Sequence, residues 1–523
     1  MLVSESDVAR SAAEPFDVAI IGAGIVGVFC ALQLERHGLR IALIEGGGVT
    51  PDTLFNAKFT ATAGRAHSTI DSGRAMGLGG TGLLWGGQLS EFGAADLTGD
   101  KGYWPVSYAE LRALYDRVYA ALRLPPRMDN AAARGLFGGD EGIVGEVERI
   151  FSYWLPNPNL AGMFRETISR SPALTVFTRC KAVGLSFDDN ARARQVRLRT
   201  PSGPAAIAAN RVVIAAGVVE SARFTLAAQR EENCPWRGNA RIGMAFQDHI
   251  GGEFGALLVK NERLFRNRFE TGFDQKTKYM PKLRFVGAAG GSGTMLGICA
   301  FPSFRSDIAE HIRNIKLMLK AIRSGSSYSR WRELPASIMK IGGAFLPLIH
   351  RYIREHRVLA MMDQGVDLAF QCEQIPRPDS RITLGDGPDA ADGLPPVILD
   401  WRTGSDEAEF LRTAASHFAR YFRETGCAEL KLDRALLEDA PGFVSRLRDT
   451  SHPAGGLCMS RTQAGGATDP DGRIWGSANV YVAGAAALAT SGEANITLTA
   501  LALTLRLTDH LTGAHAEVEQ AGA

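Results

Sequence analysis

A glycine-rich turn between two short apolar segments constrains the fold more than any other feature of this chain. Residues 17–21 read DVAII, and residues 22–27 read GAGIVG. An amphipathic stretch then runs to Gly38, and a second apolar run, residues 40–44, ends at Glu45. A strand, a glycine turn, a helix and a second strand within about 30 residues indicate a dinucleotide-binding βαβ unit.

Each glycine of this turn has its own physical reason. Gly22 permits the tight turn, Gly24 lets the backbone approach a pyrophosphate, and Gly27 lets the helix pack closely on the strand. Free N–H groups at the start of the helix favour the phosphates. Glu45 is placed to accept a hydrogen bond from a ribose hydroxyl and would repel a 2′-phosphate. The turn therefore predicts a dinucleotide with an unphosphorylated adenosine ribose, either NAD or FAD.

A second glycine-rich segment follows. Residues 74–81 read RAMGLGGT and residues 82–87 read GLLWGG. So little side-chain bulk is expected where a chain lies along a flat ring or a phosphate. The alternative is a flexible surface loop, which the interleaved leucines and Trp85 disfavour because large apolar side chains are poor surface residues.

Motifs spread along the chain resemble those of the glucose–methanol–choline (GMC) oxidoreductase family, whose members hold FAD and oxidise alcohols. The late motifs are SHP at 451–453, VYVAGA at 480–485 and TSGEANITLT at 490–499. The earlier ones are WPVSY at 104–108, VVIAAGVVES at 212–221, QDH at 247–249, EQIP at 373–376 and DSRIT at 379–383. Residues from about 258 to 360 match only a generic substrate domain.

The resemblance implies FAD and a set of residues that contact it. We expect these to be Gly22, Gly24, Gly27, Glu45, Arg74, Gly79, Gly80, Thr81, Trp85, Val183, Gly217, Gly484, Ala485, Asn495 and Thr497. Val183 would pair its backbone with the adenine, although core packing explains this residue nearly as well. No metal ligand is expected.

Two departures from the family pattern matter. Gly484 stands where the family commonly has Asp, a feature shared with the pyranose oxidase branch, which the late motifs resemble most. The histidine that carries a covalent flavin in that branch would fall on Leu84, and leucine cannot form the bond. The resemblance therefore implies FAD held without a covalent link.

His452 and Asn495 are the expected catalytic pair. They stand 43 positions apart, the separation typical of the His/Asn or His/His pair of the family. Oxidation of an alcohol by hydride transfer to flavin N5 requires loss of the hydroxyl proton, and a neutral histidine suits the role of general base. The Asn495 amide can orient the same oxygen. His249 matches a motif that we interpret as structural.

The sequence predicts an FAD-binding domain assembled from residues 14–105, 175–255 and 450–515, of α/β class with a parallel sheet. Its last long helix, residues 496–511, would point its N-terminus at the flavin and favour negative charge there. Residues 106–174 and 256–449 would form an α+β substrate-binding domain of sheet and helices. Strands near 279–285, 295–301 and 366–372 should line the pocket.

A basic segment, residues 304–357, interrupts the substrate-binding domain. It holds eleven Lys and Arg against four Asp and Glu, whereas the whole chain has a net charge of +2. Apolar residues recur at helical spacing beside these charges, which predicts amphipathic helices. One hypothesis is peripheral contact with anionic lipid; the alternative is a solvated helical insertion packed on the sheet or on another subunit.

Composition limits the remaining choices. A chain with 45% hydrophobic and 22% charged residues is an ordinary globular protein, and a net charge of +2 gives no global field for nucleic acid. Seven scattered cysteines without C-x-x-C argue against a disulfide framework or a zinc site. A polar N-terminus without an apolar h-region predicts no signal peptide. We expect a cytoplasmic protein, or one peripheral to the inner face of a membrane.

The substrate class stays open at this stage. Likeness to pyranose oxidases favours a secondary hydroxyl of a sugar or glycoside, whereas an apolar insertion suits a sterol, long-chain or aromatic alcohol. A non-redox flavoprotein, such as a lyase or photodecarboxylase, and a binding protein that keeps FAD as a structural group are further alternatives. The sequence does not assign an electron acceptor.

Overall fold

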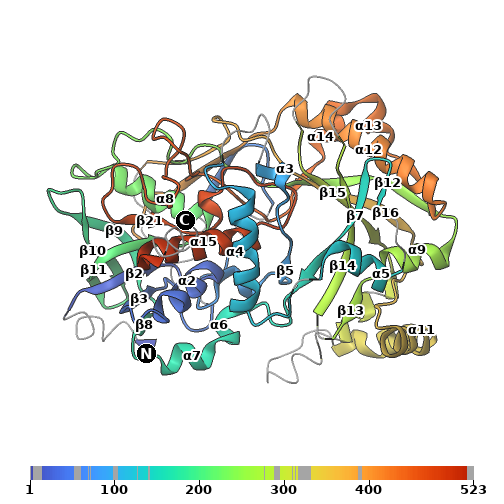
Figure 1. Cartoon of the computed structure of the whole chain (residues 1–523), viewed down its shortest axis with the longest axis horizontal. Helices are drawn as coiled ribbons and strands as arrows, with labels where there is room; N and C mark the ends of the chain where they lie inside the picture. Colours follow the sequence, from blue (N-terminus) through green and yellow to red (C-terminus); the bar gives the residue numbers. More distant parts are fainter. Residues whose placement is uncertain are drawn as a thin grey trace, which may run out of the picture.

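The protein is built around two large sheets that lie side by side (Figure 1). The computed structural model describes residues 2–3, 14–51, 60–68, 70, 72–97, 104–126, 128–138, 142–275, 277–287, 295–308, 310–312, 314–315, 318, 331–386 and 392–514. Mixed α/β architecture is confirmed, with one sheet parallel at its centre and the other antiparallel.

The first sheet follows from the apolar runs of the sequence. Its strand order is β1-β8-β3-β2-β11-β10-β9, and β21 pairs with β11. The strands are β1 (Leu2–Val3), β2 (Phe16–Ile21), β3 (Ile41–Ile44), β8 (Leu174–Phe177), β9 (Lys181–Phe187), β10 (Ala193–Thr200), β11 (Gly203–Ile214) and β21 (Val480–Val482). Strands β2, β3, β8 and β21 run parallel to their neighbours and are almost wholly buried, as expected for a sheet covered on both faces.

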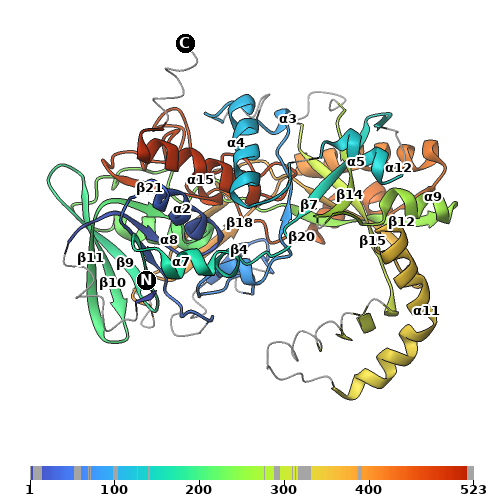
Figure 2. The same ribbon diagram turned by 60° about the horizontal axis from the view of Figure 1, so that its bottom comes forward.

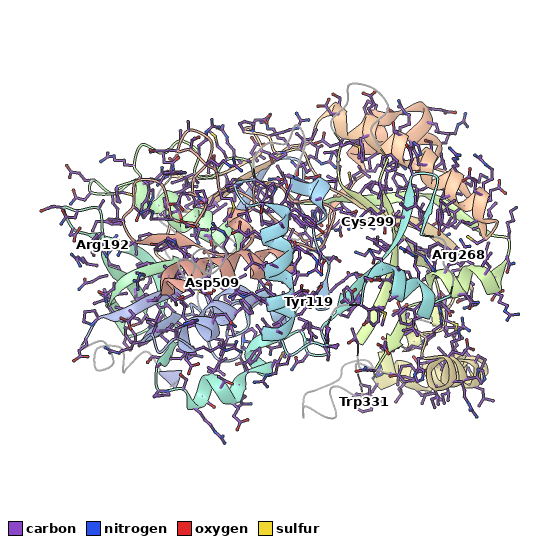
Figure 3. All side chains as sticks on the ribbon, viewed as in Figure 1. Tyr119, Arg192, Arg268, Cys299, Trp331 and Asp509 are labelled. Atoms are coloured by element: carbon purple, nitrogen blue, oxygen red, sulfur yellow. The ribbon has the colours of Figure 1, made fainter. Side chains whose placement is uncertain are left out.

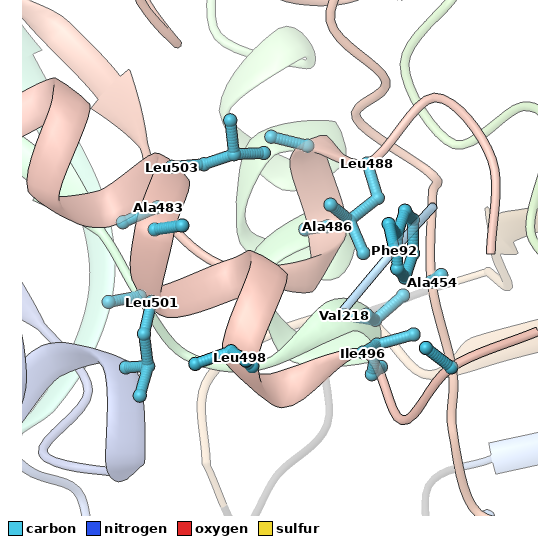
Figure 4. Close-up of a cluster of buried hydrophobic side chains, with 14 of the residues drawn as sticks. Phe92, Val218, Ala454, Ala483, Ala486, Leu488, Ile496, Leu498, Leu501 and Leu503 are labelled. Atoms are coloured by element: carbon cyan, nitrogen blue, oxygen red, sulfur yellow. The ribbon is translucent and has the colours of Figure 1, made fainter. Parts of the chain in front are cut away.

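Helices from distant parts of the chain cover this sheet. They are α2 (Ile25–Glu35), α6 (Leu160–Met163), α7 (Arg165–Arg170), α8 (Val218–Gln229) and α15 (Thr497–Thr512). Helix α15 packs against α2 and against α4 (Tyr108–Ala121), and it lies in a core of small and branched apolar side chains that includes Leu498, Leu501 and Leu503 (Figure 4). The predicted hydrophobic helix after Asn495 is therefore a central element of the fold.

The second sheet has the order β19-β12-β16-β15-β14-β7-β5 and is antiparallel throughout. Its strands are β5 (Gln88–Leu89), β6 (Ile143–Val144), β7 (Val147–Trp154), β12 (Ile250–Val259), β13 (Gly272–Asp274), β14 (Thr277–Phe285), β15 (Ile298–Phe304), β16 (Val366–Cys372), β19 (Ala428–Leu432) and β20 (Arg448–Asp449). The helices on this half are α5 (Asn130–Leu136), α9 (Glu262–Phe269), α12 (Ser405–Thr425), α13 (Arg434–Glu438) and α14 (Ala440–Ser445).

Some strands lie outside the domain segments drawn from the sequence. Strand β12 begins at Ile250, inside the segment 175–255, yet belongs to the second sheet. A third, small sheet has the order β17 (Arg381–Leu384), β18 (Val397–Trp401) and β4 (Thr60–Gly64). Because β18 pairs with β4, part of the segment 256–449 is hydrogen-bonded to part of the segment 14–105.

Helix α11 (Leu334–Glu355) extends away from the second sheet (Figure 2). Trp331 lies just before it, also remote from the first sheet (Figure 3). Of the eleven basic residues of the segment 304–357, those at 313, 316, 320, 323 and 330 lie outside the described residues. Within the described part of the chain, no helix is both long and apolar enough to traverse a lipid bilayer.

Candidate active site

A cavity of about 940 Å³ is lined by both large sheets. It brings together most of the residues expected to bind the cofactor or to act in catalysis. Those at its wall are Gly22, Gly24, Glu45, Arg74, Gly80, Thr81, Trp85, Gly217, His452, Gly484, Ala485, Asn495 and Thr497. Gly27, Gly79 and Val183 do not line it. The roles of all these residues remain predictions, but their convergence on one cavity is a property of the fold.

The first glycine turn has the close approaches that its sequence predicts. Gly22 has a φ of +101°, and a Cβ there would lie 2.7 Å from the carbonyl oxygen of Ala215. A Cβ on Gly27 would lie 1.8 Å from the Gly22 oxygen, so this residue packs helix α2 on the turn and does not face the cavity. At Gly24 the nearest atom to a Cβ, on Gly80, is 4.0 Å away. The turn therefore leaves its backbone open to the cavity at Gly24.

The second glycine loop docks on the first through backbone atoms. The Gly79 N–H donates to the Ala23 carbonyl at 2.8 Å, which explains why Gly79 supports the wall without lining it. A Cβ on Gly80 would lie 2.8 Å from the Gly24 Cα. The Trp85 indole donates to the Pro158 carbonyl at 2.9 Å. Side chains larger than hydrogen would separate the two loops.

Glu45 holds the turn as well as lining the cavity. Its two carboxylate oxygens accept from the N–H groups of Ala23 and Gly47, both at 2.9 Å. Burial raises the pKa of Glu45 above its ordinary value, and the N–H donors and Lys181 oppose that rise. The carboxylate thus retains acceptor capacity for the predicted ribose hydroxyl.

Val183 lies next to the cavity wall, and its contact with the adenine stays a prediction. Cys180, Lys181 and Ala182 line the cavity, and Val183 does not.

Lys181 Nζ lies 2.6 Å from Glu220, and Arg74 lies 3.2 Å from the same carboxylate. Although burial alone would raise it, the pKa of Glu220 is held at about 2 by Lys181, Arg223 and Arg74. The cations at this end of the cavity therefore share an anionic partner.

His452 and Asn495 meet at the opposite end. Asn495 Nδ2 lies 2.8 Å from His452 Nε2, although the residues are 43 positions apart. Asn495 stands two residues before the start of α15, whereas His452 follows Ser451, whose φ of +63° places it in the left-handed region. Such backbone costs about 1 to 3 kcal/mol and is common where a functional side chain must be aimed.

The hydrogen bonds around His452 assign its tautomer. Because the Asn495 NH₂ group donates to Nε2, Nε2 carries a lone pair and Nδ1 carries the proton. His452 Nδ1 lies 2.9 Å from Thr450 Oγ1 and 3.3 Å from His249 Nδ1. His249 donates from Nε2 to the Ser491 carbonyl at 3.0 Å, so its Nδ1 is an acceptor. His452 is therefore a neutral imidazole with its basic nitrogen beside Asn495.

Electrostatics keep His452 neutral. Burial, His249 and Lys282 lower the pKa of His452 well below its ordinary value of 6.5. Burial also lowers the pKa of His249. Because both rings therefore stay neutral near neutral pH, His452 keeps the lone pair that a general base needs.

Three further groups around the pair were not singled out by sequence reasoning as functional. His249, interpreted as structural, contacts His452 directly. Lys282 Nζ donates to Asn495 Oδ1 at 3.2 Å. Asp248 accepts from the N–H groups of His452 at 3.0 Å and of Thr450 at 3.3 Å, and so fixes the backbone of the loop. The QDH motif was the only signal for the first and last of these.

His67 joins this support beneath the loop. Its Nε2 lies 3.1 Å from Asp248, and its Nδ1 lies 3.8 Å from Asp449. All three side chains are buried and their ligand atoms are close enough to hold a metal ion. The two carboxylates lie toward opposite nitrogens of one ring, an arrangement that also orients the imidazole without a metal. It is a grouping that sequence spacing did not reveal.

The cavity fits a dinucleotide cofactor. Helix α2 begins at the wall without a side-chain cap, so the N–H groups of its first turn are available to phosphate. A Cβ on Gly217 would meet no atom within 4 Å, and Gly217 lines the cavity, so the backbone there is open to a ligand. Helix α15 also begins uncapped at the wall, on the His452 side.

Comparisons with known proteins agree with this geometry. The family model described as FAD dependent oxidoreductase matches residues 17–235, and the one described as GMC oxidoreductase matches residues 376–504. No curated protein sequence matches the chain.

Several solved structures share the fold over nearly the whole chain. Pyridoxine 4-oxidase from Mesorbium loti is 15% identical, with 95% of this chain and 99% of that chain covered and a TM-score of 0.58. An Aspergillus oryzae formate oxidase is 13% identical, with coverage of 97% and 99% and a TM-score of 0.57. A fungal aryl-alcohol oxidase is 14% identical, with coverage of 96% and 100% and a TM-score of 0.58. Residues 17–235 thus match an FAD-dependent oxidoreductase domain, and residues 376–504 match a GMC oxidoreductase C-terminal domain.

Proposed function

We propose that this protein oxidises an alcohol to a carbonyl compound, with His452 as the general base and with FAD held non-covalently. The observation that carries the proposal is the 2.8 Å contact between the basic nitrogen of His452 and the Asn495 amide, at the wall of the cavity. Leu84 also lines the cavity, and its side chain has no atom able to bond covalently to a flavin.

A hydroxyl group that enters between the two nitrogens replaces their direct hydrogen bond. The alcohol O–H donates to His452 Nε2, and its oxygen accepts from Asn495 Nδ2. As the C–H bond breaks, the hydroxyl proton passes to Nε2 and the C=O bond forms. FAD, when bound, supplies an acceptor for the hydride that leaves the carbon.

Helix α15 supports charge separation in this step. Its uncapped N-terminus lies beside Asn495 and Thr497 at the wall. The helix dipole and the free N–H groups of the first turn favour negative charge there, worth about 0.3 to 1 kcal/mol at an exposed terminus and more in a buried one. When FAD is bound and its flavin carries negative charge at this position, that charge would also stabilise protonated His452 on the same side of the cavity.

An aromatic alcohol suits the cavity wall better than a sugar. Trp154, Met280 and Phe301 line the cavity, and aromatic and apolar side chains favour flat apolar ligands. The names of two structural neighbours, pyridoxine 4-oxidase and aryl-alcohol oxidase, point the same way. The resemblance of the late motifs to pyranose oxidases keeps a sugar hydroxyl as the second choice.

The test is anaerobic mixing of the holoenzyme with benzyl alcohol, 1-phenylethanol, glucose and cholesterol. Loss of the oxidised flavin absorbance, with the matching carbonyl product, is the expected result for an aromatic alcohol. Reduction by glucose alone would replace the aromatic assignment with the sugar one. If no alcohol reduces the flavin and product forms only under light or without an electron acceptor, the non-redox alternative is correct.

We also propose that α11 rests on the surface of a membrane that contains anionic lipid. Ile338, Met339, Leu346 and Ile353 are each more than half exposed and share one face of the helix, which we call the α11 face. The opposite side is anchored to the protein, with Ser337 and Ile341 buried. Large exposed apolar side chains along a helix mark an interaction surface.

The charges beside the α11 face favour lipid as its occupant. Arg332, Lys340 and Arg354 are exposed along one margin of the α11 face. Other basic residues of the segment are engaged within the protein, such as Arg351 with Glu270 at 2.8 Å. An apolar face flanked by cations is typical of helices that lie in the interface of an anionic bilayer.

Flotation with liposomes tests this surface. Vesicles of phosphatidylcholine with phosphatidylglycerol should carry the protein upward at low salt, and those of phosphatidylcholine alone should carry less. The double variant Ile338→Glu/Leu346→Glu should stay at the bottom, whereas Leu437→Glu, at another exposed apolar residue, should float. If the wild-type protein does not float but forms a dimer that the double variant does not form, the α11 face contacts a second copy of the chain instead.

A further inference from the structure

The cavity contains a buried positive charge on its antiparallel side. Lys282 in β14 is 3% exposed and lines the cavity. Its Nζ donates to Asn495 Oδ1 at 3.2 Å and lies 5.6 Å from the centre of the Phe301 ring. Among the described residues, no carboxylate oxygen comes within 4.0 Å of this nitrogen. One of its three donors is used by Asn495, which leaves two for a ligand.

The neighbouring residue Arg284, unlike Lys282, has its charge neutralised by a contacting carboxylate. Arg284 lies two residues along β14, on the same face of the strand, and forms an ion pair with Glu493. Lys282 meets Asn495, two residues after Glu493, and thus meets a neutral amide where Arg284 meets a carboxylate. An ammonium group removed from water is costly unless an anion compensates it.

We propose that Lys282 binds the carboxylate of the substrate, and that the substrate is a 2-hydroxy acid with an aromatic side chain. This inference rests on the proposed function, since His452 must deprotonate the hydroxyl of the same molecule. A single amide, that of Asn495, contacts both His452 Nε2 and Lys282 Nζ. Because one amide bridges the two nitrogens, a hydroxyl and a carboxylate that reach them together lie close in the substrate, as on the adjacent carbons of a 2-hydroxy acid.

The remaining walls complete the substrate class. Phe301 on β15 lies beside Lys282 on β14, and Trp154 and Met280 line the cavity from the same face of the sheet, so that an aryl group meets an apolar surface. The reaction balances as for any alcohol. The carbinol C–H and O–H bonds break, the hydride leaves to FAD, the proton passes to His452, and a 2-oxo acid forms with its carboxylate unchanged.

Four matched alcohols test the assignment on the holoenzyme. They are mandelate, mandelamide, 1-phenylethanol and 4-(hydroxymethyl)benzoate, in which the charge lies too far from the hydroxyl. We expect flavin reduction by one enantiomer of mandelate with a kcat/KM about 10- to 100-fold above the other three, the value of one charge-assisted hydrogen bond. A wild-type enzyme that prefers mandelamide or 1-phenylethanol would overturn the inference.

The variant Lys282→Met separates substrate binding from orientation of Asn495. It should raise the KM for mandelate about 10- to 100-fold and leave kcat/KM for mandelamide within a few-fold, because it removes a binding interaction that only mandelate makes. An equal loss for both substrates would show that Lys282 only orients Asn495, and the inference would fail. Lys431→Met, on the exposed edge strand β19 of the same sheet, should behave as wild type.

A binding measurement keeps this test independent of turnover. Phenylacetate has no hydroxyl to oxidise, and titration calorimetry should show it binding to wild type and at least about 10-fold more weakly to Lys282→Met, with phenylacetamide weak in both. Equal binding of the acid and the amide to wild type refutes the anion site even if the variant does not fold. If phenylacetate binds through Lys282 but no alcohol reduces the flavin, the anion site stands and the proposed alcohol oxidation fails.

Discussion

The two ends of the cavity are built from different chemical groups. The dinucleotide end uses backbone, with Gly22, Gly24 and Gly80 in close approach and an uncapped helix N-terminus at the wall. The catalytic end uses side chains, His452, Asn495 and Lys282, that arrive from three distant parts of the chain. The difference indicates that the first end depends on the space that glycines leave, whereas the second depends on hydrogen bonds between side chains.

The two ends of the cavity also differ in how their charged side chains are paired. At the dinucleotide end Lys181 and Arg74 both lie against the Glu220 carboxylate, so each cation has an anionic partner. At the catalytic end Lys282 faces an amide, and two histidines nearby resist protonation. We infer that the cations of the first end have their anionic partner before a substrate arrives, whereas Lys282 gains a directly contacting anion only when an anionic substrate binds.

Substitution of His452 should give the largest effect and should separate the two ends. His452→Ala removes the base but touches no part of the dinucleotide end, so FAD should remain bound while flavin reduction by an alcohol falls about 100- to 10,000-fold. Rapid mixing under anaerobic conditions gives the rate, and the flavin absorbance of the purified variant gives the occupancy.

The control for this variant is His37→Ala, because His37 is exposed at the end of α2 and far from the pair in sequence. It should reduce at the wild-type rate. An unchanged rate in His452→Ala would remove His452 from the mechanism, and loss of FAD from this variant would show that the two ends are not independent.

Substitution of Gly27 should break the other end. A Cβ at this position would lie 1.8 Å from the Gly22 oxygen, a backbone atom that cannot move without opening the turn. Gly27→Ala should lower the free energy of unfolding by about 1 to 3 kcal/mol or more and reduce the bound FAD. Urea denaturation of the apoprotein and the flavin content after purification measure the two effects.

Gly135→Ala is the matched control, since a Cβ on Gly135 in α5 would meet no atom within 4 Å. In a helix this change should stabilise the protein slightly, by about 0.4 to 1 kcal/mol. Equal stability of Gly27→Ala and wild type would contradict the role of close helix packing in the turn.

The contrast between backbone contacts at one end of the cavity and side-chain contacts at the other also explains which parts of the site the sequence could predict. Residues 17–45 place a strand, a turn, a helix and Glu45 close together in the chain, so local pattern was enough to predict the βαβ unit. His452 and Asn495 were predicted from motifs and spacing of a family, because no local rule brings residues 43 positions apart into contact.

Lys282 could not be predicted, because its role depends on which strand lies opposite Asn495 in the folded chain. Only the alternation along β14, with Lys278, Met280, Lys282 and Arg284 on one face, suggested that this face was not an ordinary core surface. For Val183, register decided the outcome, since the cavity wall ends at the preceding residue.

The acid limb of the pH profile should respond most subtly, and it tests the charge of the catalytic end. His452 acts as a base only when neutral, so kcat/KM falls as the pH drops through its pKa. Because burial, His249 and Lys282 lower that pKa well below 6.5, wild type should keep its activity below pH 6.5. Lys282→Met removes one of these causes, so the pKa of His452 should rise and the fall in activity should begin at a higher pH.

A neutral substrate such as 1-phenylethanol isolates this effect from substrate charge, and Lys431→Met should leave the profile in place. A limb that stays fixed or moves to lower pH in Lys282→Met would mean that the ammonium does not act on His452, and that burial alone sets its basicity.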